Sequence, residues 1–291
     1  MLNKKKDNEI MEKVYTVKEV REQVKAWKKE GLSVGLVPTM GYLHEGHASL
    51  IKKAVEQNDK VVVSVFLNPT QFGPTEDLEA YPRDFEADCK LCESIGAAVV
   101  FHPEPSEMYA PDFCTWVDMD VLSKTLCGQS RPIHFRGVCT VVSKLFNIVT
   151  PDRAYFGQKD AQQLAIIRRM VRDLNMDIEI VGCPIVREED GLAKSSRNTY
   201  LNEEERKAAL ILSKAVSLGK QMVEGGETSA AAVKEAMIKK IESEPMAKID
   251  YVEAVDGLSM QPVEEIKAPT LVAMAVYIGK TRLIDNFIVE E

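Results

Sequence analysis

Between residues 34 and 184 the chain alternates short runs of β-branched and other apolar residues with longer segments of helical periodicity. This alternation is typical of a parallel sheet covered by helices, because parallel strands need long crossover connections that are usually helical. The runs interpreted as strands are Leu32–Val37, Val61–Leu67, Ala98–Phe101, Arg153–Phe156 and Ile178–Gly182. The pattern therefore predicts an α/β fold with a parallel sheet and helices on its faces.

Helical periodicity is clearest in two of the segments between these runs. One apolar stripe ends before Pro151, and a second begins after Asp160, which stands at the expected N-cap position. The first stripe contains Val138, Val141, Val142, Leu145 and Val149, and the second contains Leu164, Ile167, Val171 and Leu174. Both predict helices that cover the sheet with an apolar face.

Another helical face carries Phe85, Cys89 and Cys92 at positions i, i+4 and i+7. Because no second cysteine pair accompanies them, core packing is favoured over a zinc or redox pair. Asp84 and Asp88 lie on the neighbouring face. A solvated acidic face is the expected interpretation there, with Mg²⁺ binding as the alternative.

Beyond residue 198 the composition changes and a smaller unit begins. Asn202 and Glu205 form a capping pair that predicts a helix reaching about Val223. A further helix is expected over residues 229–244, followed by strands over 249–255, 271–276 and 283–289. We therefore expect a large domain over residues 13–186, a small α+β domain over 187–291, and a disordered tail over the charged, patternless residues 1–12.

The charge balance argues against a nucleic-acid-binding protein, because the chain has 37 Lys and Arg but 45 Asp and Glu, which gives a net charge of −8. An anionic ligand must then be held by a local cluster of positive groups. Six cysteines are scattered without the spacing of a disulfide framework, no cleavable apolar leader is found, and no apolar run reaches membrane-spanning length. These features predict a cytoplasmic protein without membrane partners.

A glycine turn with two histidines, PTMGYLHEGH at residues 38–47, follows the first apolar run. Zinc binding is unfavoured, because the helical His-Glu-x-x-His pattern needs histidines four apart and only two further histidines are present. Gly41 and Gly46 have the separation of a Walker loop, but His47 and Ala48 replace its lysine and hydroxyl. A helix starting near His47 favours a bound phosphate, while a tight connection with solvated histidines stays open as the alternative.

Three further polar stretches accompany this turn. Residues 66–72, FLNPTQF, place Gln71 where an amide can meet both a carboxylate and a hydroxyl, unless the stretch is a plain loop. Residues 156–163, FGQKDAQQ, place Lys159 at a helix N-terminus, where it neutralises a phosphate or is simply solvated. Residues 191–198, GLAKSSRN, offer a lysine, two hydroxyls and an arginine as a phosphate clamp or a solvated linker.

Together these stretches resemble the pantoate–β-alanine ligases, a family of the nucleotidyltransferase superfamily whose HIGH-type signature is shared with class I aminoacyl-tRNA synthetases. The four motifs occur in the family's order over nearly the whole chain. The resemblance implies a Rossmann-like sheet with helices on both faces. A fifth stretch, RPIHFRGV at residues 131–138, also matches, with Arg131 and Arg136 as candidates to face the nucleotide.

Two positions depart from the family pattern. Ile133 replaces a glycine, which would strain a loop that needs positive φ at that position. Lys194 replaces the apolar residue expected at that position, whereas its neighbours match the family pattern.

The resemblance also implies roles for single residues. His44, His47 and Lys159 are the expected catalytic residues, with the imidazoles stabilising charge on the phosphates of ATP and His47 acting as proton donor. Gln71 is expected to contact pantoate and β-alanine, and Gln163 to contact pantoate. The expected ATP-binding residues are Met40, Gly41, Tyr42, Leu43, His44, Glu45, Gly46, His47, Gly157, Gln158, Lys159, Asp160, Val186, Lys194, Ser195, Ser196 and Arg197.

The reaction that the resemblance implies has two steps. The carboxylate of pantoate attacks the α-phosphorus of ATP and pyrophosphate leaves; the amine of β-alanine then attacks the mixed anhydride, giving pantothenate and AMP. Mg²⁺, positive side chains and imidazoles stabilise the developing charge, and a nearby triphosphate is expected to hold an imidazole protonated.

Only small molecules and a second copy of the chain are expected as partners, since the resemblance suggests a homodimer. Two alternatives stay open. One is a nucleotidyltransferase that stops at an adenylated or cytidylylated product, and the other is a nucleotide-sensing module without turnover.

Overall fold

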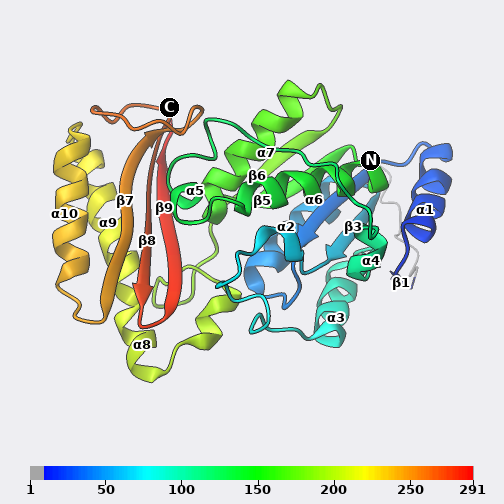
Figure 1. The fold of residues 1–291 in the computed structure, drawn as a ribbon, viewed down its shortest axis with the longest axis horizontal. Coiled ribbons are helices and arrows are strands. Elements are labelled where there is room, and N and C mark those ends of the chain that lie inside the picture. The colour runs from blue at the N-terminus through cyan, green and yellow to red at the C-terminus, as the bar shows by residue number, and fades with distance from the viewer. Residues whose placement is uncertain (1–9, 291) are drawn as a thin grey trace, which may run out of the picture.

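The computed structural model describes residues 10–290, which form a six-stranded parallel sheet flanked by helices and a separate three-stranded antiparallel sheet (Figure 1). The strand order of the large sheet is β1-β4-β3-β2-β5-β6. Its strands are β1 Glu12–Val14, β2 Val34–Thr39, β3 Lys60–Val65, β4 Val99–Phe101, β5 Arg153–Gly157 and β6 Glu179–Cys183. Each of the five apolar runs predicted as strands overlaps one of these strands, so the predicted parallel sheet is confirmed.

The order of the strands reverses between β2 and β5. From β2 the chain moves outward through β3 and β4 on one side, and β5 and β6 are added on the other side of β2. In open parallel sheets such a switch point opens a crevice at the carboxyl ends of the strands, where the two connections part. The glycine turn follows β2 and the FGQKDAQQ stretch follows β5, so both lie at this crevice.

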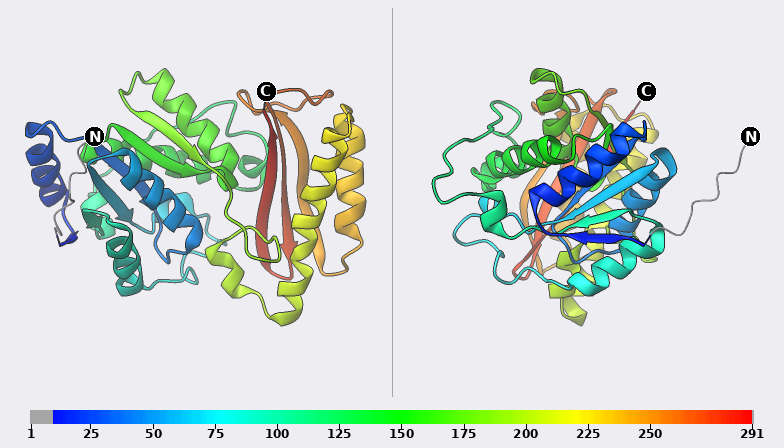
Figure 2. Two further views of the ribbon diagram at one scale, coloured as in Figure 1. Left: turned by 180° about the vertical axis from the view of Figure 1, so that it is seen from behind. Right: turned by 90° about the vertical axis from the view of Figure 1, so that its right-hand side faces the viewer.

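Helices cover both faces of the sheet. On one face pack α1 Val17–Lys29, α6 His134–Val149 and α7 Ala161–Asp173, and on the other α2 Glu45–Gln57 and α3 Phe85–Ile95 (Figure 2). Alternate residues of β3 enter the two cores: Val62 belongs to the first, and Val61 and Val63 to the second. Cys89 and Cys92 are buried in the second core, as the helical spacing predicted.

The first elements, β1 and α1, correct the predicted tail. Glu12 pairs with Val99 in the sheet and Met11 is buried, so the fold begins before residue 13. Thr16 and Glu19 form a capping box at the start of α1, a sequence signal that apolar periodicity alone does not reveal. The rest of the predicted tail, residues 1–9, lies outside the described residues.

The C-terminal unit is an antiparallel sheet of order β7-β8-β9 covered by helices. Its elements are α8 Glu203–Ala208, α9 Leu210–Glu224, α10 Ala230–Glu242, β7 Ala247–Asp256, β8 Thr270–Ile278 and β9 Thr281–Val289. Asn202 and Glu205 form the predicted capping box, although the expected single helix is interrupted at Ala209. The small α+β domain is thereby confirmed, while its boundary at residue 187 stays a prediction.

Short helical turns complete the described chain, and three of them carry site residues. The turns are η1 Pro69–Gln71, α4 Pro105–Met108, α5 Cys127–Ser130, η2 Gln158–Asp160 and η3 Ser196–Tyr200. In Figure 1 the C-terminal sheet stands beside the large domain with β9 as the strand nearest to it. None of the helices described for residues 10–290 has the length and apolarity to span a bilayer.

Candidate active site

The glycine turn after β2 is pinned by a buried carboxylate. Gly41 and Tyr42 adopt left-handed φ values of 86° and 52°, which turn the chain sharply toward α2. Asp88 of α3 accepts hydrogen bonds from the backbone N–H groups of Tyr42 at 2.9 Å and Leu43 at 2.6 Å. Its side chain is buried, and burial raises the pKa of Asp88. Asp88 is therefore a structural clamp, and the predicted solvated face and its Mg²⁺ alternative are both wrong at this residue.

The two histidines cap α2. His44 is the N-cap, and its Nδ1 accepts from the N–H of Gly46 at 3.1 Å. Nδ1 of His47 accepts from the N–H of His44 at 3.3 Å. Because Nδ1 is the acceptor in each neutral ring, the hydrogen resides on Nε2. The rings lie 4.2 Å apart and both line the cavity described below, to which they offer two N–H donors.

Burial and nearby cations keep both imidazoles neutral. Burial, with a smaller effect of Lys159, lowers the pKa of His44 to about 4. Burial, together with His44 and Lys159, lowers the pKa of His47 to about 3. At neutral pH each ring in this structure is therefore an uncharged donor. Protonation, as the sequence suggested, would require a bound anion strong enough to reverse these effects.

Acidification should consequently destabilise the protein between about pH 6.5 and pH 4. In this window an unfolded histidine takes up a proton, whereas His44 and His47 in the folded chain stay neutral. The unfolded state then binds more protons, and the free energy of unfolding falls as pH falls. We expect NMR titration to show these low pKa values and His47→Gln to flatten the pH dependence of unfolding. Ring resonances that titrate near pH 6.5 would contradict this.

The turn after β5 supplies a cation to the same crevice. Nζ of Lys159 lies 3.2 Å from the carboxylate of Asp160, and both side chains line the cavity. Asp160 occupies the predicted N-cap position of α7, although its side chain makes no capping hydrogen bond. Gln163 lies in the first turn of α7 and also lines the cavity, with no hydrogen bond to its amide from the described residues.

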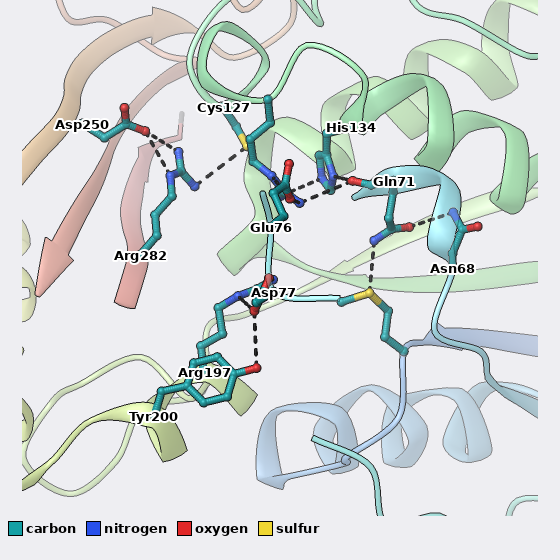
Figure 3. Close-up of polar contacts among 12 residues, drawn as sticks. Asn68, Gln71, Glu76, Asp77, Cys127, His134, Arg197, Tyr200, Asp250 and Arg282 are labelled. Carbon is teal, nitrogen blue, oxygen red and sulfur yellow. Dashed lines mark hydrogen bonds and ion pairs between the residues drawn. The ribbon is translucent and has the colours of Figure 1, made fainter. Parts of the chain in front are cut away.

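The turn after β3 supplies a second amide. Gln71 ends η1 and is buried, with Oε1 accepting from Nδ2 of Asn68 at 3.1 Å and Nε2 donating to Sδ of Met40 at 3.1 Å (Figure 3). Its backbone carbonyl accepts from Nδ1 of His134 at 3.0 Å. The side-chain amide and the backbone carbonyl of Gln71 are thus both held by hydrogen bonds within the protein.

The RPIHFRGV stretch runs from the end of α5 into α6 and packs beside this turn. The guanidinium of Arg131 forms an ion pair with Glu76, its Nε lying 2.8 Å from the carboxylate, and it lines the cavity. Arg136 instead stacks on Trp116, its guanidinium carbon 4.5 Å from the ring centroid, and it lines neither this cavity nor the larger one beside it. Ile133 has φ −94°, which any residue adopts, so the expected strain from the missing glycine is absent.

The segment after β6 folds back over the glycine turn. Oγ of Ser196 donates to the carbonyl of Tyr42 at 3.3 Å, and Lys194 forms an ion pair with Glu45 at 2.9 Å. Arg197 holds Asp77 through two hydrogen bonds of 2.9 Å (Figure 3). Asp77 lies in the loop before α3, so a single ion pair links two segments far apart in the sequence.

One cavity of about 220 Å³ gathers most of the predicted site. The predicted residues that line it are Met40, His44, Gly46, His47, Gln71, Gly157, Lys159, Asp160, Gln163, Val186, Lys194, Ser195, Ser196 and Arg197. It adjoins a larger cavity of about 520 Å³ that reaches the C-terminal sheet and shares Lys159, Gln163 and Arg197 with it.

The predicted residues outside the lining are Gly41, Tyr42, Leu43, Glu45 and Gln158. Gly41, Tyr42 and Leu43 form the backbone of the glycine turn, and Glu45 forms an ion pair with Lys194. Among residues 10–290 no cluster of three or more His, Cys, Asp or Glu side chains is arranged to hold a metal ion.

Comparisons with known proteins agree with this geometry. A family model for pantoate–β-alanine ligases matches residues 12–288. The pantothenate synthetase of Ruminiclostridium cellulolyticum is 67% identical over 277 residues, covering 95% of this chain and 98% of the relative.

Two solved structures are similar over almost their full length. The pantothenate synthetase of Thermus thermophilus has a TM-score of 0.90 at 43% identity, covering 97% of this chain and 100% of the other. The pantoate–β-alanine ligase of Francisella tularensis, solved in complex with β-γ ATP and β-alanine, has a TM-score of 0.78 at 32% identity, covering 96% and 97% of the two chains.

Proposed function

The chain belongs to the pantoate–β-alanine ligase family, and we propose that the cavity at the ends of β2 and β5 carries out the reaction of that family. The enzyme condenses pantoate with β-alanine. A carboxylate oxygen of pantoate bonds to the α-phosphorus of ATP as the bond to pyrophosphate breaks. The amine of β-alanine then bonds to the acyl carbon, loses a proton, and AMP leaves. The observation that carries this is the convergence of two imidazole N–H donors, a lysine and a serine-arginine segment on one cavity.

We assign the phosphate groups of ATP to the positive end of the cavity. His44 and His47 would donate from Nε2 to phosphate oxygens as neutral rings, which costs no protonation step. Lys159 and Arg197 would supply the charge that offsets the negative charge growing on the departing pyrophosphate. The support is that these donors are held in place by backbone and side-chain hydrogen bonds before substrate arrives, so little reorganisation is needed during the reaction.

We assign pantoate to the two glutamines. Gln71 and Gln163 approach the cavity from η1 and α7, and an amide can donate to a carboxylate and accept from a hydroxyl. The amide of Gln163 has no other partner among the described side chains, which suits a group that waits for a ligand. β-Alanine would enter beside Gln71.

Mg²⁺ would arrive with the triphosphate, because this ion usually keeps substrate phosphates and waters as ligands and takes only one or two carboxylates. Asp160 lines the cavity beside Lys159 and is the hard oxygen donor that fits such a role. Bound there, the ion would neutralise phosphate charge. A homodimer and a cytoplasmic location are also part of the proposal, and sedimentation velocity tests the first.

The decisive measurement is pyrophosphate release from ATP, Mg²⁺ and pantoate, with and without β-alanine. We expect release of one equivalent of pyrophosphate per active site without β-alanine, and continuous release of pyrophosphate and AMP when it is added. Release of AMP that does not depend on the amine would indicate an enzyme that stops at an adenylated product. ATP binding with no pyrophosphate release would indicate a sensing module and would overturn the proposal.

A further inference from the structure

We propose that Asn286 of the C-terminal sheet is a positioning residue for Lys159. Asn286 lies on β9 and is 4% exposed. Its Nδ2 donates one hydrogen bond to the backbone carbonyl of Gln158 at 3.1 Å and another to that of Lys159 at 2.9 Å. Both N–H groups of this amide thus donate hydrogen bonds to the turn that carries the lysine. The inference rests on the proposed function, since it assumes that Lys159 meets the triphosphate.

The orientation of this amide follows from its surroundings. Two carbonyl oxygens face the same end of the side chain, so that end must be the NH₂ group, because an oxygen there would be repelled. The other end, Oδ1, is buried and has no hydrogen-bond partner among the described residues. A buried unpaired acceptor costs free energy. The residue therefore forgoes one hydrogen bond while holding the η2 turn with two.

The η2 turn has little else to fix it. It is a single 3-10 turn of three residues between β5 and α7, and Asp160 at its end makes no capping hydrogen bond. In the described part of the chain, the backbone carbonyls of Gln158 and Lys159 accept side-chain hydrogen bonds from Asn286 alone. The position of the backbone that carries Lys159 thus depends on β9, a strand of the other domain, while Asp160 holds the ammonium group of the side chain.

The neighbouring residue fixes β9 to the interdomain segment. Asp285 is 1% exposed and holds the guanidinium of Arg187 through hydrogen bonds of 2.7 and 2.8 Å. Arg187 follows β6 and precedes the serine-arginine segment, and the N–H of Asn286 donates to Asp285 at 2.8 Å. Successive residues of β9 therefore hold the segments that lead to Arg197 and to Lys159. We therefore expect the docking of the C-terminal sheet to set the positions of the two cations that bind phosphate.

The test is a double-mutant cycle on the full chain between Asn286 and Lys159, with continuous pyrophosphate release from ATP, pantoate and β-alanine as the readout. Asn286→Asp keeps the shape of the side chain but turns a carboxylate oxygen toward the two carbonyls. We expect roughly a tenfold lower kcat with an unchanged KM for pantoate. In a Lys159→Ala background the same change should have no further effect, because a residue that acts through Lys159 has nothing left to position. Asn147→Asp, the same substitution at an exposed site on α6, is the control and should match wild type.

Each outcome decides the inference. Equal losses in the wild-type and Lys159→Ala backgrounds, or no loss in Asn286→Asp, would overturn it while leaving the proposed function intact. Wild-type protein without pyrophosphate release would instead overturn the proposed function. Asn286→Ala, which removes the donor without adding charge, guards against misfolding of the first variant. Failure of both variants to unfold cooperatively would make Asn286 a residue of general stability and would also overturn the inference.

Discussion

Replacing His47 by alanine is expected to lower the rate of pyrophosphate release from ATP and pantoate about 100- to 1000-fold while the chain keeps its fold. The variant loses an Nε2–H donor that is fixed in direction, because Nδ1 of the same ring accepts from the N–H of His44. A preorganised donor of this kind stabilises charge that develops in the transition state far more than charge in the ground state. The affinity for ATP should therefore change less than kcat. Near-normal pyrophosphate release would remove His47 from the mechanism.

The same substitution also removes part of the helix cap, so a second variant separates the two effects. Loss of a cap costs about 1 kcal/mol of stability, which a thermal unfolding curve detects. His47→Asn offers an oxygen that can accept from the N–H of His44, yet its side chain is too short to donate where the ring does. We expect His47→Asn to regain stability relative to His47→Ala but not activity. Recovery of both would mean that the imidazole serves only as a cap.

The strands and helices were predictable because their signals are local. Apolar runs such as Val61–Leu67 are long enough to be buried on both faces, and the capping pair of Asn202 and Glu205 is complete within four residues. The position of the site followed from the same local signals, since motifs at the ends of β2 and β5 must meet at a switch point. Strand β1 was not predicted, because its three residues are too few to show a periodic pattern.

The supports of the site were not predictable, because each depends on a contact between distant segments. Asp88 reads as an exposed helical residue until the turn at residues 41–43 is folded over α3, where its carboxylate accepts two backbone N–H groups. Asp77 and Asn286 likewise sit in a loop and a strand with no motif of their own. The side chains that we propose to touch substrate belong to short motifs at strand ends, whereas those that hold them come from elsewhere in the chain. The sequence therefore predicts which groups meet but not what fixes them.

Gly137 exemplifies such a support, and Gly137→Ala should lower kcat/KM for pantoate about 100-fold. A Cβ atom at this position of α6 would lie 2.5 Å from the carbonyl oxygen of Thr70 and 2.6 Å from Cα and N of Gln71. All three are backbone atoms, so no side chain can rotate to make room. Ordinary contacts between such atoms are about 3.5 Å, so η1 must move by about 1 Å and carry the amide of Gln71 with it.

The sign of the stability change distinguishes this clash from helix propensity. In an exposed helix, alanine is about 1 kcal/mol more favourable than glycine, whereas overpacking a core costs about 1–3 kcal/mol. Because Gly137 is buried against backbone, we expect Gly137→Ala to be less stable than wild type. Asn147→Ala on the exposed face of α6 is the matched control and should keep the kinetics of wild type. An unchanged kcat/KM for pantoate in Gly137→Ala would show that the position of η1 does not govern pantoate binding. That result would contradict the assignment of Gln71 to pantoate.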